Sequence, residues 1–458
     1  MIRVILILAA STVVVGGVVL FRHHLYFGPP LPEGDAFEEW RQLGAEIWGV
    51  DTPGEWAPVV EVIELMEQVE ADVIAEMPPP DDRTSGQRLR FALPEGEEQR
   101  PEDAAFFAWQ EESCRAAVDE LRRRGVFDRV RALPSQAPVW DGSGNQSIVP
   151  AERLSYRWGS PIRRIARALK ADLQIAIEQD DPVRAVEAME AIRSLSSLLV
   201  AQPSELSWLV WAAIEPLGRS AVTEAIVIGT LTPKVVEALA RAEQPGSDGA
   251  LAMAWWGEIL LDRWLMSTGF DDSVVTRWDA AAQHEPMRFA LEACIEAYQT
   301  RTYEDAVAAI DDAQAHVGAW PKAAYWRLRT EACWFEGRSG LLRALEQHRV
   351  TSIAHRTVFA IERFRLEHGE HPESLRDLVP RYLSEEPRGV GSPNGLVYQP
   401  GDPRSGDLGY ILYSVGRDAT DHFGVGPDTH GQWGALGNVE AKGDVMLVGP
   451  DGLLTPSE

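Results

Sequence analysis

The sequence contains few of the residues that build disulfide frameworks and metal clusters. Its 458 residues include only three cysteines, Cys114, Cys294 and Cys333, which lie far apart and form no CxxC pair. This spacing excludes a disulfide-stapled fold and a cysteine-type zinc site. Cys294 and Cys333 could still pair across two helices in an oxidising compartment, but we favour buried, small apolar thiols as the interpretation of these positions.

The motifs of common catalytic and phosphate-binding sites are also missing. His284 and Glu285 lack the second histidine of an HExxH zinc motif, and no GxSxG sequence occurs. The glycine-rich stretch GVGSPNG (389–395) lacks the closing Lys-Ser/Thr of a phosphate loop, so we interpret it as a turn. His368 and His371 are three residues apart, but the glycine between them removes the common helix face that a metal pair would use. We therefore predict a protein that is not an enzyme. The alternative, an enzyme with its site in a helical cleft, predicts buried titratable residues that converge there.

Basic residues are scarce relative to acidic ones. Lysine and arginine total 43 against 70 aspartate and glutamate, and the formal net charge is −27 at pH 7. Such a surface repels phosphate backbones and anionic lipid headgroups, which argues against a nucleic-acid partner. Hydrophobic residues make up 45% of the chain and charged residues 25%, as in globular proteins, so we expect the body to fold around a core.

One hydrophobic run is long enough to cross a membrane. Residues 4–21 (VILILAASTVVVGGVVLF) carry no charge, and as a helix they match the thickness of the bilayer core. The following residues contain no small-x-small cleavage site and no lipoprotein cysteine, so we predict an uncleaved anchor over 1–27 rather than a cleaved signal peptide or a buried core helix. The charge difference between Arg3 and Arg22, on either side of the span, is small.

We expect this segment to act as a signal-anchor. It would hold the chain in the inner (cytoplasmic) membrane by a single pass, with the bulk of the protein periplasmic or otherwise extracytoplasmic. Residues 28–36 (GPPLPEGDA) follow as a Pro/Gly-rich linker.

From residue 37 to 348 the pattern predicts one helix after another. Turn-rich stretches separate the helices at 77–86, 93–103, 141–150 and 243–250. Three helix starts share a capping side chain followed by proline in the first turn, at Ser160-Pro161, Asp181-Pro182 and Thr232-Pro233. These starts are 21 and then 51 residues apart, so no fixed repeat exists and we predict an irregular array of helical hairpins.

Apolar residues after the first two starts recur at helical spacing. The two sets are Ile162, Ile165, Leu169, Leu173 and Ala176, and then Val186, Met189 and Ile192. The first stripe leaves out Arg163, Arg164 and Lys170. The intervening EQDD (178–181) then forms the turn of an αα-hairpin, and a second hairpin is predicted over 303–334. Such surfaces bind proteins or peptides, although a plain helical bundle explains the pattern equally well.

The composition changes after Arg349, and residues 349–458 are predicted to form a small α+β module. A first helix ends at His368, with Gly369 as its C-cap, and its apolar positions are Ile353, Val358, Ile361 and Phe364. A second short helix follows over 371–383, with apolar positions Leu375, Leu378 and Val379 and with Pro380 in its last turn.

Three short apolar runs complete the module. They lie at 396–399, 409–415 and 444–448, and predict antiparallel strands joined by long loops. The predicted fold class is therefore mainly α, with an N-terminal transmembrane helix, an irregular helical-hairpin array and a small C-terminal module with short antiparallel strands.

Four segments of this module occur in a distinctive order. They are AIERFRLEHGEHPESLRDLVPRYL (360–383), LVYQ (396–399), GYILYSVGRDATDHFG (409–424) and GDVML (443–447). Together they resemble the C-terminal segment of the major pseudopilin of type II secretion, over about 90 residues. The whole chain also resembles membrane-anchored helical envelope proteins of planctomycete-like bacteria.

The resemblance implies a calcium site in the loop that follows the strand at 409–415. Pseudopilins hold calcium with backbone carbonyls and loop aspartates, and the positions that match or lie between the matches are Val415, Asp418, Asp421, Asp428 and Asp444. A flexible loop can supply the six to eight hard oxygens that calcium prefers. The alternative is that these aspartates only form turns.

The resemblance does not extend to the N-terminus. Pseudopilins begin with a processing site and a glutamate at the fifth mature position, whereas this chain has no acidic residue before Glu33. We therefore predict that residues 1–21 are retained and that the protein forms no filaments. The predicted function is a membrane-anchored extracytoplasmic scaffold or protein-binding protein of the bacterial envelope. The alternative is a component related to type II secretion or a pilus-like system.

Overall fold

The computed structural model describes part of the chain. The described residues are 57–79, 89, 91, 104–133, 151–200, 205–242, 350–387, 396–402, 409–415, 445–449 and 452–453, with single helical residues at 292, 308, 312 and 315. Over this part the protein is mainly helical, with a small antiparallel sheet near its C-terminus. The predicted anchor, the linker and nearly all of the predicted hairpin at 303–334 lie outside it. Within it, no helix is both long and apolar enough to span a membrane.

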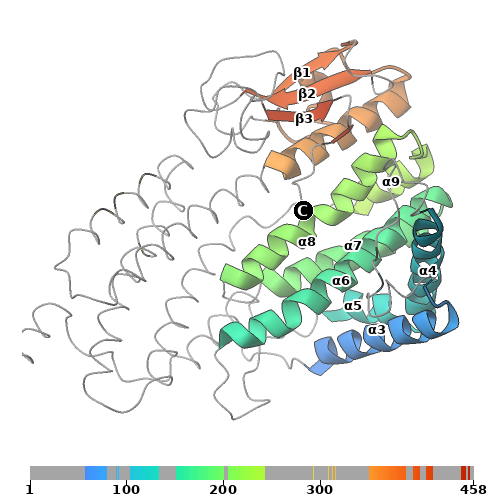
Figure 1. The fold of residues 1–458 in the computed structure, drawn as a ribbon. Coiled ribbons are helices and arrows are strands. Elements are labelled where there is room, and N and C mark those ends of the chain that lie inside the picture. The colour runs from blue at the N-terminus through green and yellow to red at the C-terminus, as the bar shows by residue number, and fades with distance from the viewer. Residues whose placement is uncertain are drawn as a thin grey trace, which may run out of the picture.

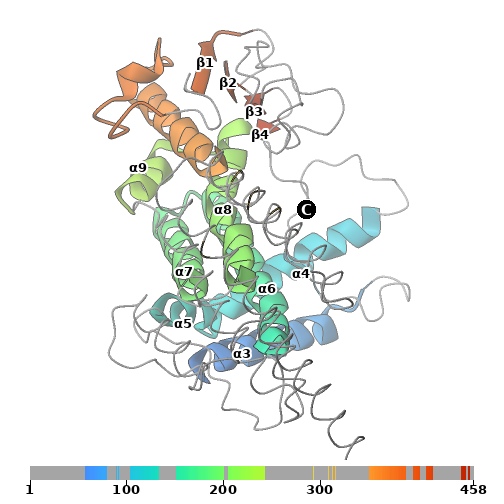
Figure 2. The same ribbon diagram turned by 90° about the vertical axis from the view of Figure 1, so that its left-hand side faces the viewer.

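The helical part is built in layers. Its elements are α3 (Ala57–Glu76), α4 (Ala104–Arg123), α5 (Val126–Ala132), α6 (Ala151–Glu178), α7 (Pro182–Val200), α8 (Glu205–Val227) and α9 (Pro233–Ala242). Helices α6, α7 and α8 pack against one another, and α7 also contacts α5 and α9 (Figure 1). Figure 2 shows α3 and α5 at the end of the molecule far from the sheet.

Two of the three predicted helix starts are confirmed. The Asp181 carboxylate accepts hydrogen bonds from the backbone amides of Val183 and Arg184, both at 3.1 Å, at the start of α7. Thr232 likewise caps α9. Residues 179–181 form the tight turn of the predicted α6–α7 hairpin.

The third start was wrong, because α6 already begins at Ala151 and runs through Pro161. Proline keeps a helical φ and removes one backbone donor, a cost that tertiary packing can offset. Pro161 is buried, as are all five residues of the predicted apolar stripe on α6. Tertiary burial therefore sets the course of this helix more strongly than the local signal does.

Helices α7 and α8 approach closely at a glycine. A Cβ atom added at Gly218 of α8 would lie 2.6 Å from the sulfur of Met189 and 3.4 Å from Cδ1 of Ile192, both on α7. The predicted apolar set on α7 is confirmed, since Met189 and Ile192 are buried and Val186 packs against the core. The absence of a side chain at Gly218 thus sets the separation of these two helices.

The C-terminal module begins with a helix over 350–368. Gly369 ends it as predicted, with φ +81° and an amide that donates to the carbonyl of Arg365 at 2.8 Å. The second predicted helix is shorter than expected, a 3₁₀ turn (η5) at Leu375–Leu378. Val379 is already extended, because the residue before a proline disfavours helical backbone angles.

All three predicted strands are confirmed. The sheet has four antiparallel strands in the order β1 (Leu396–Pro400), β2 (Tyr410–Ser414), β3 (Val445–Gly449) and β4 (Gly452–Leu453). Every residue of β2 is buried. Buried apolar residues of the module and of the helical layers belong to one continuous core, and the module lies above α8 in Figure 1.

Candidate functional site

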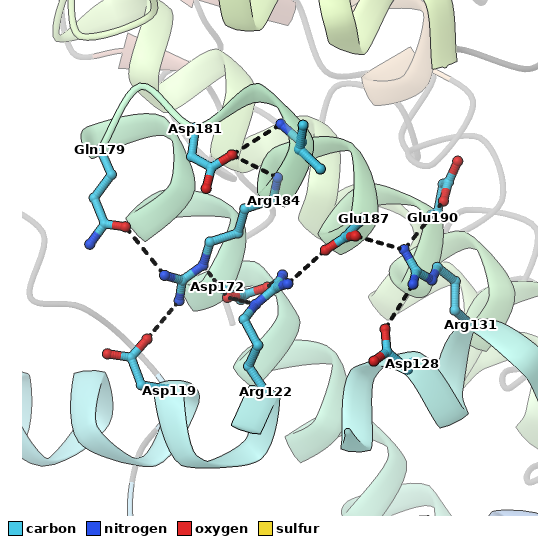
Figure 3. A network of polar contacts seen from close by, with 11 residues as sticks. Asp119, Arg122, Asp128, Arg131, Asp172, Gln179, Asp181, Arg184, Glu187 and Glu190 are labelled. Carbon is cyan, nitrogen blue, oxygen red and sulfur yellow. Dashed lines mark hydrogen bonds and ion pairs between the residues drawn. The ribbon is translucent and has the colours of Figure 1, made fainter. Parts of the chain in front are cut away.

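Charged groups converge around one buried aspartate where α4, α6 and α7 meet (Figure 3). Asp172, on α6, is fully buried. Its carboxylate accepts hydrogen bonds from Arg122 of α4, Nε at 3.3 Å and Nη2 at 2.6 Å, and from Nε of Arg184 of α7 at 2.7 Å. Both carboxylate oxygens are therefore engaged by guanidinium groups from two other helices.

The network continues on both sides of Asp172. Nη1 of Arg122 donates to Glu187 of α7 at 2.7 Å, and Glu187 also lies 3.4 Å from Nη1 of Arg131 on α5. On the other side, Arg184 donates to Asp119 of α4 at 2.9 Å. Charged cross-ties thus connect α4, α5, α6 and α7, as Figure 3 shows.

The ion pair between Arg122 and Glu187 favours the charged form of both side chains. The hydrogen bond from Arg122 holds the pKa of Glu187 below its usual range, although partial burial opposes it. Burial lowers the pKa of Arg122, but its hydrogen bonds to Asp172 and Glu187 outweigh burial and raise that pKa overall. Both shifts favour the charged forms of Arg122 and Glu187, as in a structural ion pair.

A second buried pair connects α6 to α3. Arg164 forms an ion pair with Glu70, and Glu67 lies 3.8 Å from its Nη1 atom. Burial lowers the pKa of Arg164. The sequence places Arg164 off the apolar stripe of α6, yet the residue is buried, because α3 covers a second face of this helix.

The C-terminal module contacts α8 through polar groups. Nη1 of Arg219 donates to the hydroxyl of Ser352 at 2.6 Å, and Oγ1 of Thr223 lies 2.6 Å from Nδ1 of His355. Ser352 and His355 are both buried and lie on the helix over 350–368. This contact fixes the module to the helical layers through directional bonds as well as through the shared apolar core.

Inside the module, titratable side chains gather between the helix and the sheet. Glu362 is buried on the helix, and its Oε2 accepts a 2.7 Å hydrogen bond from Arg365. Nε2 of His371 lies 3.6 Å from Oε1 of Glu362. The ring of His371 meets the ring of Tyr410, on β2, edge to face at a centroid distance of 5.2 Å. The ring of Tyr398, on β1, also contacts the ring of Tyr410, at a centroid distance of 5.6 Å.

The residues predicted from sequence to bind calcium lie mostly outside the described part. Val415, which follows β2, is buried, whereas Asp418, Asp421, Asp428 and Asp444 fall outside. Among the described residues, no group of three or more His, Cys, Asp or Glu side chains could hold a metal ion.

The two histidines near Gly369 contact different partners. His368 packs against Phe364 and lies 3.2 Å from the hydroxyl of Tyr382, whereas His371 faces Glu362 and the sheet. Cys114 is buried in α4 as a small apolar side chain, and Cys294 and Cys333 lie outside the described residues.

Sequence reasoning missed both the Asp172 network and the Glu362 cluster. The partners of Asp172 lie 50 and 12 residues away, and no local spacing marks them. The one available signal was an aspartate within the strongly apolar face of α6, since such a residue needs a charged partner when it is buried.

The fold defines the class of the protein, a mainly helical chain with a small C-terminal antiparallel sheet packed on α8. No protein-family model, curated protein or solved structure matches this chain.

Proposed function

We propose that this protein is a membrane-anchored, extracytoplasmic scaffold of the bacterial envelope, in which an irregular array of helical hairpins holds the C-terminal module in a fixed position for a protein partner. The observation that carries the proposal is the ion-pair network around the buried Asp172, which connects four helices through three arginines. Such multiple directional ties favour one arrangement of helices over sliding alternatives.

The contact between the module and α8 supports the same proposal. The hydrogen bond from Arg219 to Ser352 and the contact of Thr223 with His355 join elements that are more than 130 residues apart in the sequence. A module fixed in this way moves with the helical array as one unit. This is the property that a scaffold requires in order to present a binding surface at a set position.

The turns of two neighbouring hairpins are candidate partner-binding positions. Asp180, in the α6–α7 turn, accepts a 2.5 Å hydrogen bond from Thr232, in the α8–α9 turn, and its carbonyl accepts one from Lys234 at the start of α9. Next to these turns, Val183 and Ile228 expose 66% and 71% of their surface, the large hydrophobic residues that stand out as exposed in the described part. Exposed apolar side chains on a rigid framework favour a protein partner.

Photo-crosslinking in cells tests the binding role. A photoreactive amino acid at position 183 or 228 of the full chain should give a discrete adduct with a second protein. The same amino acid at position 237, an exposed site on α9, serves as the control and should give none. Absence of adducts at both test positions, or equal adducts at all three, would contradict the proposed surface.

The proposed topology has its own test. A reporter enzyme that is active only in the periplasm, fused after Glu458, should be active, and a cytoplasm-dependent reporter should be inactive. The opposite pattern would overturn the extracytoplasmic location without bearing on the helical scaffold itself.

A component related to type II secretion is the second candidate function. The helix that ends at Gly369, the short η5 turn and the antiparallel strands follow the order that the pseudopilin resemblance implies. Mass spectrometry of the membrane-extracted protein distinguishes the two candidates. Retention of residues 1–21 favours the scaffold, whereas a new N-terminus within or just after this segment favours the secretion-related component.

We further propose that the loop between β2 and β3 binds one calcium ion. Ser414 pairs with Val445, so the last residue of β2 and the first residue of β3 lie side by side at the end of the sheet from which this loop leaves. Val415 directly follows β2 in the sequence and Asp444 directly precedes β3, and calcium accepts a mixture of carbonyl and carboxylate ligands.

Calcium binding should raise the melting temperature of the full chain relative to a chelator control, and Asp418→Ala should remove the shift. Asp128→Ala, in the helical part, should keep it. Equal melting with calcium and with chelator would leave the aspartates as turn residues.

A further inference from the structure

The contact between helix 350–368 and the sheet contains polar groups that lack full pairing. Tyr410 is completely buried, and neither its hydroxyl nor Nε2 of His371 makes a hydrogen bond within the described part of the chain. Nε2 points toward the buried carboxylate of Glu362 at 3.6 Å, which is just beyond hydrogen-bonding length. A buried imidazole nitrogen next to a carboxylate requires a physical explanation, because an unpaired buried polar atom costs free energy.

The fold holds the imidazole of His371 in this position. Gly409, directly before β2, has φ +79°, and a Cβ atom added there would lie 3.1 Å from Cε1 and 3.3 Å from Nδ1 of His371. The edge-to-face contact with Tyr410 restrains the ring on another side. His371 is therefore wedged between β2 and the helix, with its Nε2 atom directed at Glu362.

The other charged and titratable groups around His371 come from each packed element. Arg365, on the helix, occupies only Oε2 of Glu362, so Oε1 is left facing His371. From β2, burial and the charge of Glu362 raise the pKa of Tyr410 well above its usual range, so this phenol stays neutral. From β1, the hydroxyl of Tyr398 donates to the carbonyl of Pro372.

Two acidic groups complete these surroundings. Asp377 of η5 is engaged by the backbone amide and hydroxyl of Ser374. Among the described residues, Glu362 is therefore the carboxylate that faces the imidazole of His371.

We propose that His371 and Glu362 form a proton-binding latch, in which protonation of His371 on acidification completes a charged hydrogen bond to Glu362 and tightens the sheet onto helix 350–368. The proton comes from solvent, and Nε2 becomes the donor and Oε1 the acceptor. A side-chain movement of less than 1 Å brings the pair from 3.6 Å to the usual length of about 2.8 Å for such a bond.

The direction of the pH effect follows from linkage. The carboxylate of Glu362 lies beside the imidazole only when the module is folded, so the proposed charged hydrogen bond exists only in the folded module. The added stability is therefore present at acidic pH and is lost as the pH rises and His371 releases the proton. Histidine is the side chain suited to such a response between pH 5 and 8.

Hydrogen exchange of the detergent-solubilised full chain tests this latch at pH 5.5 and pH 8.0, after correction for the intrinsic exchange rates. Peptides that cover 396–402 and 409–415 should show about tenfold greater protection at pH 5.5 than at pH 8.0. Glu362→Gln and His371→Gln should each remove this difference. His368→Gln is the matched control, because His368 lies three residues away and faces Phe364 and Tyr382, and it should keep the difference.

Arg365→Gln provides an independent test if Glu362→Gln or His371→Gln fails to fold. Arg365 is partly exposed and competes for the carboxylate of Glu362, so Arg365→Gln should move the midpoint of the protection change to higher pH. The latch is overturned if the wild type shows equal protection at both pH values, or if the pH response survives in His371→Gln. It is also overturned if the response is lost in His368→Gln, or if Arg365→Gln moves the midpoint to lower pH.

Discussion

Replacement of Asp172 by asparagine should destabilise the helical part strongly while it preserves the shape of the side chain. The carboxylate is fully buried and pairs with Arg122 and Arg184, of which 28% and 11% of the side-chain surface is exposed. Breaking a buried ion pair costs about 3–5 kcal/mol when a charge is left uncompensated. Here Arg122 keeps Glu187 and Arg184 keeps Asp119, so we expect a loss of about 2–4 kcal/mol.

The assay must follow the helical part, because a chain of this size need not unfold in one step. Hydrogen exchange of peptides from α4, α6 and α7, combined with urea unfolding, reports the local and total loss of stability. Arg241→Ala is the matched control, since Arg241 pairs with Glu237 on an exposed face of α9 and its loss should cost less than about 0.5 kcal/mol. The assigned structural role of this network is refuted if Asp172→Asn changes stability no more than this control does.

Three further predictions concern packing, capping and pH. Gly218→Val should destabilise the protein by about 1–3 kcal/mol, because its Cβ would meet Met189, and adding Met189→Ala should cost less than the sum of the two single losses. Asp181→Ala should cost about 1 kcal/mol by removing the cap of α7, measured by urea unfolding. Arg122 holds the pKa of Glu187 below its usual range, so the ionised carboxylate of Glu187 stabilises the fold above about pH 5 and this stabilisation is lost as the pH falls. Arg122→Gln should therefore reduce the loss of stability on acidification, measured by acid unfolding.

Each of these predictions has an outcome that contradicts it. Strict additivity of the Gly218 and Met189 changes would mean that the close approach of α7 and α8 is not limited by this contact. A loss below about 0.3 kcal/mol for Asp181→Ala would mean that Pro182 alone starts α7. An acid-unfolding profile of Arg122→Gln parallel to that of the wild type would show that Glu187 makes no linked contribution.

Features that depend on neighbouring residues were predictable from the sequence. The caps at Asp181 and Thr232 and the C-cap at Gly369 rest on backbone hydrogen bonds within one turn, so the residue types alone indicate them. The strands of the C-terminal module and their antiparallel arrangement followed from short apolar runs separated by turn-rich loops.

Helix boundaries predicted from local sequence motifs were wrong where the structure extends or shortens the helix. The Ser160-Pro161 signature is a valid helix start in isolation, but α6 extends back to Ala151 through a buried proline. The second short helix of the module shrank to the η5 turn, because the extended backbone before Pro380 ended it.

The sequence by itself determined the mainly helical class, the hairpin turn between α6 and α7, and the helix-then-strands order of the C-terminal module, since periodicity and capping act over a few residues. Only the tertiary structure decided that Asp172 meets Arg122 and Arg184, and that His371 turns back onto Glu362. A charged residue has many potential partners of opposite sign in the chain. Which of them it meets depends on how whole helices and strands pack, and that choice is made by the burial of apolar surface over the entire core.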